Sequence, residues 1–575
     1  MPVLLIVVLL GLVTFAQKGF KKNAARENYI QRAVGDLTFN KDVAPIISKN
    51  CSGCHRPGQP APFALISYAD VKKHASDIVK VTQRRYMPPW PPESGHGDFV
   101  GARRLTANDL GILQQWVAEG APEGKPEDRP PKREWASDWQ LGPPDLVVSM
   151  PKPYELPAEG RDVYRNFIVP VPITARKYVR ALEFRPGNPR VVHHTFIRMD
   201  RTGKARQLEE NEKAPGFPGM SISAEVPGGH FLSWQPGRGA SELPQGLSFE
   251  LDPGNDFILR MHMNPSGKPE QVQAMIGLYF TDQPPTNSCL RLLLTSTCID
   301  IPPGATNYLV HDDYRLPIDI NLIAVLPHAH YLARDIRATA TLPDDTVKSL
   351  LWIKDWDFNW QSDYRYKVPV FLPRGTVLSM NFTYDNSTNN LRNPNQPPKR
   401  VASGVQTSDE MAELWFQFLP ATQGDVSVFQ NDYGYKTKSR LIAETDFALK
   451  KNPADPAALA GKGMLLCGEG RYDMAERSFR AALRSDPNHA RAHYGLGLVF
   501  RKKEKLREAR IEFEKALQSD PWDYQAHGNL GMLALEANDL DNAENHFKEA
   551  LRLNPDDVFA RDGLRDTLQA GSRRR

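Results

Sequence analysis

The sequence predicts a multidomain fold made of a small all-α domain, two packed antiparallel β-sandwich domains and a C-terminal α-helical solenoid. Three observations predict it: a helical stretch around a Cys-x-x-Cys-His run, short alternating strands in the middle, and a 34-residue repeat at the end. A chain of 575 residues is long enough for several domains of about 100–200 residues. We place them at 37–122, 141–285, 286–425 and 441–570, with a linker at 123–140 that is charged and rich in proline.

Residues 1–22 are expected to be a signal peptide or an N-terminal anchor. The apolar run Val3–Ala16 is shorter than the roughly 20 residues of a membrane span. It is similar to the core of a secretory signal, although lysines follow the run and no basic residue precedes it, so an uncleaved anchor stays open. We therefore expect a periplasmic or secreted protein. The net charge of +4 is small, and nothing in it indicates binding to nucleic acid.

The run Cys51-Ser52-Gly53-Cys54-His55 has the spacing by which c-type haem is attached. Two thiols bond the porphyrin, and His55 follows at the position of an axial ligand to iron. A zinc half-site and a redox dithiol are the alternatives, but the sequence has no second Cys pair and no βαβ pattern here. Residues 40–122 resemble small bacterial cytochrome c domains, so we expect one covalently bound haem c.

The second axial ligand should be Met or His. We favour Met87, because prolines hold it in Tyr86–Trp90, 32 residues after His55. His74 and His96 are the alternatives. His74 lies on a lysine-rich helical stretch, so we expect it to face solvent.

Five histidines in the predicted β region fall into three tight motifs. His328 and His330 form an H-x-H run, and alternate residues of a strand point to the same face. Met411 is a candidate thioether ligand, which favours Cu(I). His193 and His194 are adjacent, so they reach one metal only if the strand ends or bulges there, or if they use different ring nitrogens; His262 would complete a three-His site. A buried His is more often structural than a ligand, but five in three motifs favour a metal, with zinc and copper both open.

In this order, the His pair, the single His, the H-x-H run and the Ser-Asp-Glu-Met run of 408–411 resemble the copper type II, ascorbate-dependent monooxygenases. That family includes peptidylglycine hydroxylating monooxygenase and dopamine β-hydroxylase. The resemblance covers about residues 141–425, and Trp356–Gln361 and Tyr384–Asn386 resemble its bacterial members. It implies two jelly-roll-like β domains that carry one copper each across a solvent cleft. It also implies an electron-transfer copper and an oxygen-binding copper, held respectively by His193, His194 and His262 and by His328, His330 and Met411.

The implied activity is hydroxylation of a substrate C–H bond with O2, with electrons from ascorbate or from the fused haem. Amidating enzymes of the family carry Arg and Asn where this chain has Leu326 and Glu413, so amidation of a peptide is not expected and the small-molecule or peptide substrate is unidentified. The alternative is a non-catalytic haem and copper electron carrier, or a redox sensor. A pure interaction scaffold is disfavoured by the haem motif.

The C-terminal region repeats with a period of 34 residues, which is typical of tetratricopeptide repeats. Pro, Gly, Ala and Phe recur in four registers: Pro453, Pro487, Pro521 and Pro555; Gly463, Gly497 and Gly531; Ala475, Ala509 and Ala543; Phe479, Phe513 and Phe547. We expect this tail to bind a protein partner or to mediate self-association. Of the remaining cysteines, Cys289 and Cys298 either form a disulfide or stay as unpaired thiols, and Cys467 is expected on a repeat helix.

Overall fold

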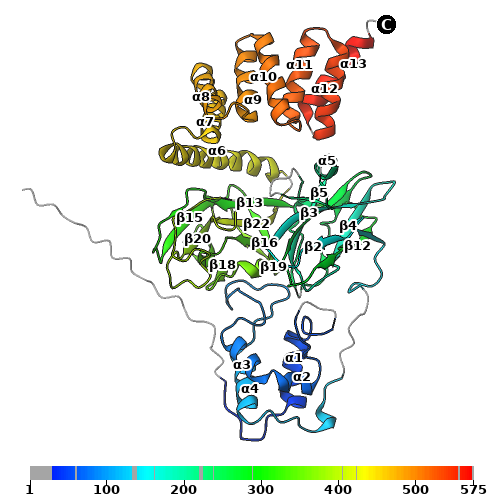
Figure 1. The fold of residues 1–575 in the computed structure, drawn as a ribbon, viewed down its shortest axis with the longest axis vertical. Coiled ribbons are helices and arrows are strands. Elements are labelled where there is room, and N and C mark those ends of the chain that lie inside the picture. The colour runs from blue at the N-terminus through cyan, green and yellow to red at the C-terminus, as the bar shows by residue number, and fades with distance from the viewer. Residues whose placement is uncertain are drawn as a thin grey trace, which may run out of the picture.

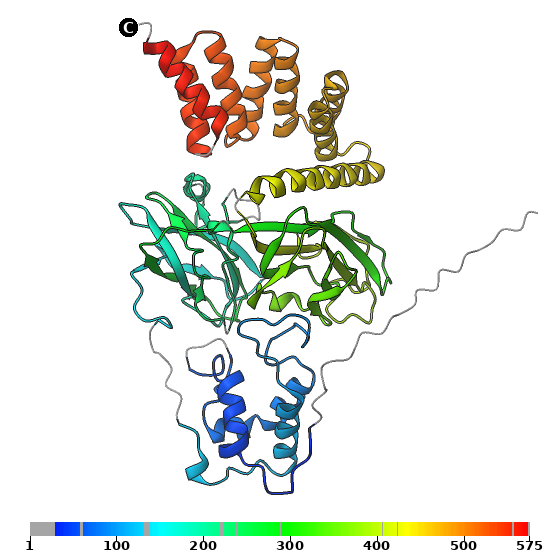
Figure 2. The same cartoon turned by 180° about the vertical axis from the view of Figure 1, so that it is seen from behind.

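The structure is a computed structural model that describes residues 29–57, 61–131, 139–160, 162–210, 212–218, 224–236, 238–287, 289–404, 406–422, 424–554 and 557–572. The predicted signal or anchor at 1–22, and residues 132–138 of the predicted linker, lie outside the described residues. Figure 1 shows helices at one end, β-sheets in the middle and the helical repeats at the other end, and Figure 2 shows the same order from behind. Among the described residues, no helix has both the length and the apolar character needed to span a membrane.

The N-terminal helical unit, residues 29–131, packs short helices around a small apolar core. Side-chain caps start two of the helices: Ser67 and Asp70 form a capping box, and so do Thr106 and Asp109. Trp116 is 1% exposed and forms the centre of the core with Phe39 and Leu113. The elements are η1 (Phe39–Val43), α1 (Ala44–Asn50), α2 (Tyr68–Lys73), α3 (Ala75–Gln83), α4 (Ala107–Ala118) and η2 (Pro126–Asp128).

The first β unit, residues 139–287, contains two five-stranded antiparallel sheets with the strand orders β1-β12-β4-β8, where β9 also pairs with β4, and β6-β3-β10-β5-β7. A shared apolar core lies between them. The strands are β1 (Leu146–Ser149), β2 (Tyr154–Leu156), β3 (Val163–Pro170), β4 (Lys177–Arg185), β5 (Val192–Asp200), β6 (Phe217–Pro218), β7 (Ser233–Trp234), β8 (Ser241–Glu242), β9 (Phe249–Leu251), β10 (Asp256–Met263), β11 (Glu270–Val272) and β12 (Met275–Thr281), with α5 (Lys204–Glu210) and η3 (Pro227–Gly229) between strands.

The second β unit, residues 289–422, contains two four-stranded antiparallel sheets with the strand orders β13-β22-β16-β19 and β15-β20-β17-β18. Alternate residues of β20 are buried, as expected for a strand that covers a core with one face. Cys289 and Cys298 carry free thiols. The elements are β13 (Leu290–Thr295), β14 (Asp300–Ile301), β15 (Tyr308–Arg315), β16 (Ile320–His328), β17 (Ala333–Thr341), β18 (Val347–Ile353), η4 (Phe358–Trp360), β19 (Tyr364–Leu372), β20 (Val377–Tyr384), β21 (Val401–Ala402) and β22 (Glu413–Pro420).

A long helix, α6 (Asp425–Lys451), leads from the second β unit to the repeats. It begins before the expected boundary at 441, because Phe429 is buried in the β core and anchors the start of the helix. The repeat unit then stacks helices in pairs. They are α7 (Pro456–Gly468), α8 (Tyr472–Ser485), α9 (Ala490–Lys502), α10 (Leu506–Ser519), α11 (Tyr524–Glu536), α12 (Leu540–Leu553) and α13 (Val558–Ser572).

The recurring Gly and Phe of the repeats contact each other. A Cβ on Gly497 would lie 2.5 Å from the ring of Phe513, and the same pairing joins Gly463 to Phe479 and Gly531 to Phe547. The missing side chain lets the two helices of a pair approach closely enough to bury the ring. All three phenylalanines are 0% exposed. The 34-residue period therefore arises because the same buried Gly–Phe contact recurs once in each helix pair.

A loop of the N-terminal helical unit packs against the second β unit and forms backbone hydrogen bonds with it. The Glu93 amide donates to Trp352 O at 2.7 Å, and the Val100 amide donates to Arg365 O at 2.8 Å. Phe99, between them, is 2% exposed in the core of the second β unit. Residues 93–100 therefore fix the chain that follows Met87 against β18 and β19.

Candidate metal and haem sites

His193, His194 and His262 come together at the end of the β5–β10 pair. One ring nitrogen from each lies within 4.8 Å of the chosen nitrogens of the other two. The Nδ1 atoms of His193 and His194 are 3.3 Å apart. Three imidazole nitrogens this close form a donor set that suits copper or zinc.

A register shift explains how two adjacent histidines face one site. On β10, His262 pairs with His194 of β5, but the next residue, Met263, pairs with Val192. His193 is therefore an extra residue on β5, as in a β-bulge, and the bulge turns its ring toward its neighbour. A bulge in the strand was one of the ways in which both adjacent histidines could face one metal. The register shift against β10 provides that bulge.

Asp162 orients the third histidine. Its Oδ2 accepts a hydrogen bond from His262 Nε2 at 2.9 Å, and Tyr164 stacks on the same imidazole at 4.2 Å. His262 Nδ1 is buried and has no hydrogen-bond partner among the described residues. An oriented imidazole with its second nitrogen free and buried is what a metal ligand requires, so the residues fit a bound ion.

Burial keeps the other two imidazoles of the three-His site neutral. It lowers the pKa of His193 to about 4, and it lowers the pKa of His194 well below the usual value for histidine. Neutral imidazole is the form that binds a metal.

The second site is built where β16 ends beside β22. His328 Nδ1 lies 2.5 Å from Gln361 Oε1, and His330 Nδ1 lies 3.0 Å from Asp409 O. Both rings are thus held through Nδ1, which leaves Nε2 of each as the candidate ligand atom. The ring centroids are 5.3 Å apart.

Met411 is linked to this pair through its neighbour Glu410. The strand pairing ends where His328 pairs with Glu413. Beyond that pair, the Glu410 carboxyl accepts hydrogen bonds from the amides of both His330 and Met411. A thioether added to two imidazoles gives a donor set suited to Cu(I).

Glu410 is a buried residue that stabilises the second site through backbone hydrogen bonds. Its carboxyl accepts backbone hydrogen bonds from His330 at 2.9 Å, from Leu332 at 2.6 Å and from Met411 at 3.2 Å. The side chain is fully buried, and this burial raises its pKa to about 8 despite the three donors. Glu410 therefore ties the H-x-H turn to the chain that carries Met411.

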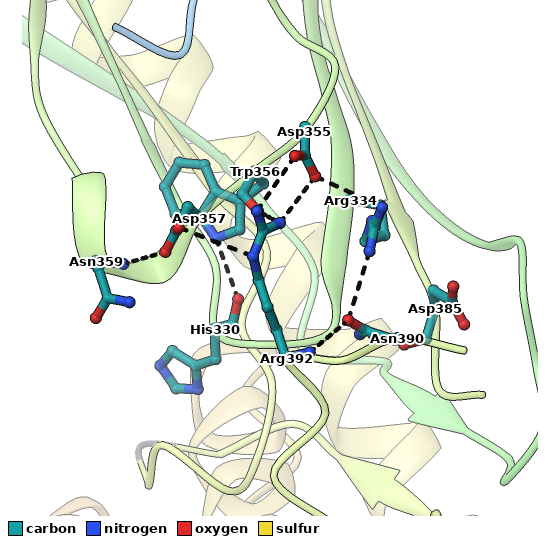
Figure 3. Close-up of polar contacts among 9 residues, drawn as sticks. All are labelled: His330, Arg334, Asp355, Trp356, Asp357, Asn359, Asp385, Asn390 and Arg392. Carbon is teal, nitrogen blue, oxygen red and sulfur yellow. Dashed lines mark hydrogen bonds and ion pairs between the residues drawn. The ribbon is translucent and has the colours of Figure 1, made fainter. Parts of the chain in front are cut away.

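A short segment, residues 355–361, lies between the two histidine groups. The centroid of the Phe358 ring lies 6.5 Å from that of the His262 ring and 5.6 Å from that of the His330 ring. Trp356 Nε1 donates to His330 O at 3.1 Å, as Figure 3 shows. Arg392 holds the segment from outside through two bonds to Asp355, at 2.8 and 3.2 Å. Phe358 thus contacts both candidate metal sites.

The Cys-x-x-Cys-His run continues the end of α1 as a tight turn. The amides of Cys54 and His55 both donate to Cys51 O, at 3.1 and 3.0 Å. His55 Nδ1 lies 3.1 Å from Phe63 O, which leaves Nε2 for an iron ligand. Both thiols are free and half-buried. This arrangement fits covalent haem attachment with His55 as an axial ligand.

The candidates for the second axial position lie in different surroundings. Met87 is half-buried in the loop after α3. His74, which was expected to face solvent, is half-buried: its ring stacks on that of Phe63 with the centroids 4.0 Å apart. His96 lies 2.7 Å from Ser349 Oγ of the second β unit.

Several residues of these sites had no assigned role at the level of sequence. Asp162 is 100 positions from His262, and no local pattern marks it. Glu410 and Phe358 lie within runs that carry the family resemblance, but their contacts depend on the folded chain. Gln361 likewise acquires its role only when η4 folds beside β16.

The comparisons with known proteins identify the C-terminal region. The tetratricopeptide repeat family matches residues 461–524 and again residues 524–557, which confirms the predicted repeats. Among solved structures, the chain is similar to the first TPR of Spaghetti (RPAP3) bound to HSP90 peptide SRMEEVD. That match has 20% identity and a TM-score of 0.20, and it covers 20% of this chain and 94% of the other. No curated protein matches the sequence. Residues 461–557 of this chain are thus tetratricopeptide repeats.

Proposed function

We propose that this chain is a copper-dependent monooxygenase that hydroxylates a C–H bond of its substrate with O2. The observation that carries the proposal is the convergence of His193, His194 and His262 into one group, with His262 Nδ1 buried and without a partner among the described residues. His328 and His330 form a second pair of rings, with their centroids 5.3 Å apart, and Met411 is the proposed third ligand there. In this proposal the β units are jelly-roll-like, and each holds one copper. The N-terminal helical unit is a cytochrome c-like domain that holds one haem c. The protein is periplasmic or secreted.

When bound, the two coppers would supply the O2 activation and electron transfer that the reaction needs. The chain's own residues hold the ligands in place before the metal arrives. Asp162 fixes the ring of His262, whereas Gln361 and the Asp409 carbonyl fix the rings of His328 and His330. Ascorbate or the haem would supply the electrons, and the repeats would bind a protein partner.

The first test is metal analysis of full-length protein matured in a periplasm. We expect two coppers and one iron per chain, from two ligand groups and one haem motif. His328→Ala and His262→Ala should each lose one copper. His311→Ala is the matched control, because His311 lies on β15 at the surface, outside both groups. Iron without copper, or zinc in place of copper, would contradict the proposal.

An electron carrier is the second candidate, favoured by one observation. Phe358 contacts both His262 and His330 and so occupies space between the two groups. O2 uptake that yields hydroxylated product in a substrate screen identifies the monooxygenase. Reversible haem and copper reduction, without product from any C–H substrate, identifies the carrier.

A further inference from the structure

The aromatic ring of Trp360 lies between the haem-motif unit and the three-His group. Its centroid is 6.1 Å from the ring of His193 and 6.5 Å from the ring of Tyr86. Tyr86 directly precedes Met87, the favoured second ligand of the haem. We propose that Trp360 is the contact through which an electron passes from the haem to the copper at His193, His194 and His262. This inference rests on the proposed function.

The Tyr86 side of this contact is held by backbone pairing. Residues 93–100, which follow Tyr86 closely, pair with β18 and β19 through the Glu93 and Val100 amides, and Phe99 is buried in the core of the second β unit. The loop that carries Tyr86 is therefore anchored to the same unit that carries Trp360.

The Trp360 side is held by a cluster of ion pairs (Figure 3). Arg392 bonds the Asp355 carboxylate and donates to Trp356 O at 2.7 Å, and its Nε lies 3.8 Å from Asp357. Arg334 adds a contact to Asp355 at 3.5 Å. Gln361, the next residue after Trp360, holds His328. The residues on both sides of η4 are thus held by hydrogen bonds.

The step is a one-electron transfer that makes or breaks no bond. Ferrous haem iron becomes ferric, and cupric ion at the three-His group becomes cuprous. No proton has to move, because the Trp360 ring serves as a close-packed medium and is not itself oxidised.

The experiment uses the full chain loaded with haem and copper, fully oxidised and free of oxygen. A photochemical reductant delivers one electron to the haem, and the ferrous haem absorbance band is followed as it decays. In the parent protein we expect a first-order decay that does not depend on protein concentration, with matching loss of the cupric resonance signal.

Trp360→Leu removes the ring and should slow this decay by roughly tenfold, equivalent to about 1.4 kcal/mol of activation free energy. Trp360→Phe keeps a ring and should restore most of the rate. Tyr86→Leu should slow the decay as well, and we expect it to fold because Tyr86 is half-exposed and is not a proposed ligand. Trp522→Leu, in the repeat unit, is the matched control. Copper content and the midpoint potentials of haem and copper are measured for every variant. These controls separate a slower rate caused by a smaller potential difference from one caused by removal of the Trp360 ring.

The outcomes separate the two proposals. If the parent binds no copper, the proposed function fails and the inference fails with it. If copper is bound but ferrous haem persists in the parent, the inference is overturned, whereas a two-copper enzyme served by ascorbate stands. If Trp360→Leu and Tyr86→Leu decay at the parent rate, Trp360 is not the path.

Discussion

Removing the Asp162 carboxylate should weaken copper binding at the three-His group without removing a ligand. The carboxylate bonds His262 Nε2 at 2.9 Å and so leaves Nδ1 as the free nitrogen. Loss of such a partner typically lowers metal affinity by about 10–100-fold. The Asp162 side chain is 36% exposed, so water screens its charge and competes for its hydrogen bond. We therefore expect the lower end for Asp162→Ala, roughly tenfold or about 1.4 kcal/mol.

The affinity is measured by titrating copper against a coloured chelator of known affinity. In the His328→Ala background, the three-His group is the proposed copper site that stays intact, so copper binding there is observed alone. Asp313→Ala is the control, because Asp313 pairs with the surface residue His311 at 3.4 Å, away from both groups. An affinity for Asp162→Ala indistinguishable from its parent would refute the argument that this carboxylate orients the ligand.

Three further predictions concern stability. Gly497→Ala would place a methyl group 2.5 Å from Phe513, which should cost about 1–3 kcal/mol; thermal melting of the helical signal checks this, with exposed Gly434, which has open space around it, as the control for Gly→Ala. Glu410→Ala leaves three buried backbone N–H groups without their acceptor, and we expect a loss of about 3 kcal/mol or more in denaturant unfolding; an unchanged midpoint would show that water replaces the carboxyl. Burial lowers the pKa of His230 to about 4, whereas unfolded histidine titrates near about 6.5, so the unfolded state binds more protons between these values. The stability that neutral His230 contributes is thus complete above pH about 6.5, and about 3 kcal/mol of it is lost as the pH falls to 4. His230→Gln should therefore reduce the dependence of the unfolding free energy on pH in this range. An unchanged dependence would assign it to other groups.

Short sequence patterns were enough to predict the parts of the chain whose contacts are close in sequence. The 34-residue period predicted the repeats, because each Gly–Phe contact joins neighbouring helices of the same pair. The Cys-x-x-Cys-His turn is likewise complete within five residues, and its amides bond to Cys51 O. Strand alternation does not explain how His328 and His330 come together, because β16 ends at His328 and His330 lies in the turn that follows.

Other features of the sites depend on residues that are far apart in the chain. His193 and His194 could share a site only through a bulge, and the bulge arises from the register of β5 against β10. His74 was expected to face solvent, but the packing of Phe63 against it decides otherwise. The start of α6 before residue 441 depends on burial of Phe429 in the second β unit.

The sequence by itself determined which side chains are candidates for metal and haem binding, and the type of element that carries most of them. Ligand identity and strand or helix periodicity are properties of short segments. The tertiary structure alone decided how those side chains are oriented and what lies between them. Asp162 beside His262, Glu410 beneath the H-x-H turn, Phe358 between the two histidine groups and Trp360 beside His193 each come from a distant part of the chain. Such contacts form only when separate elements pack together, because hydrogen-bond and ring-contact distances depend on the fold as a whole.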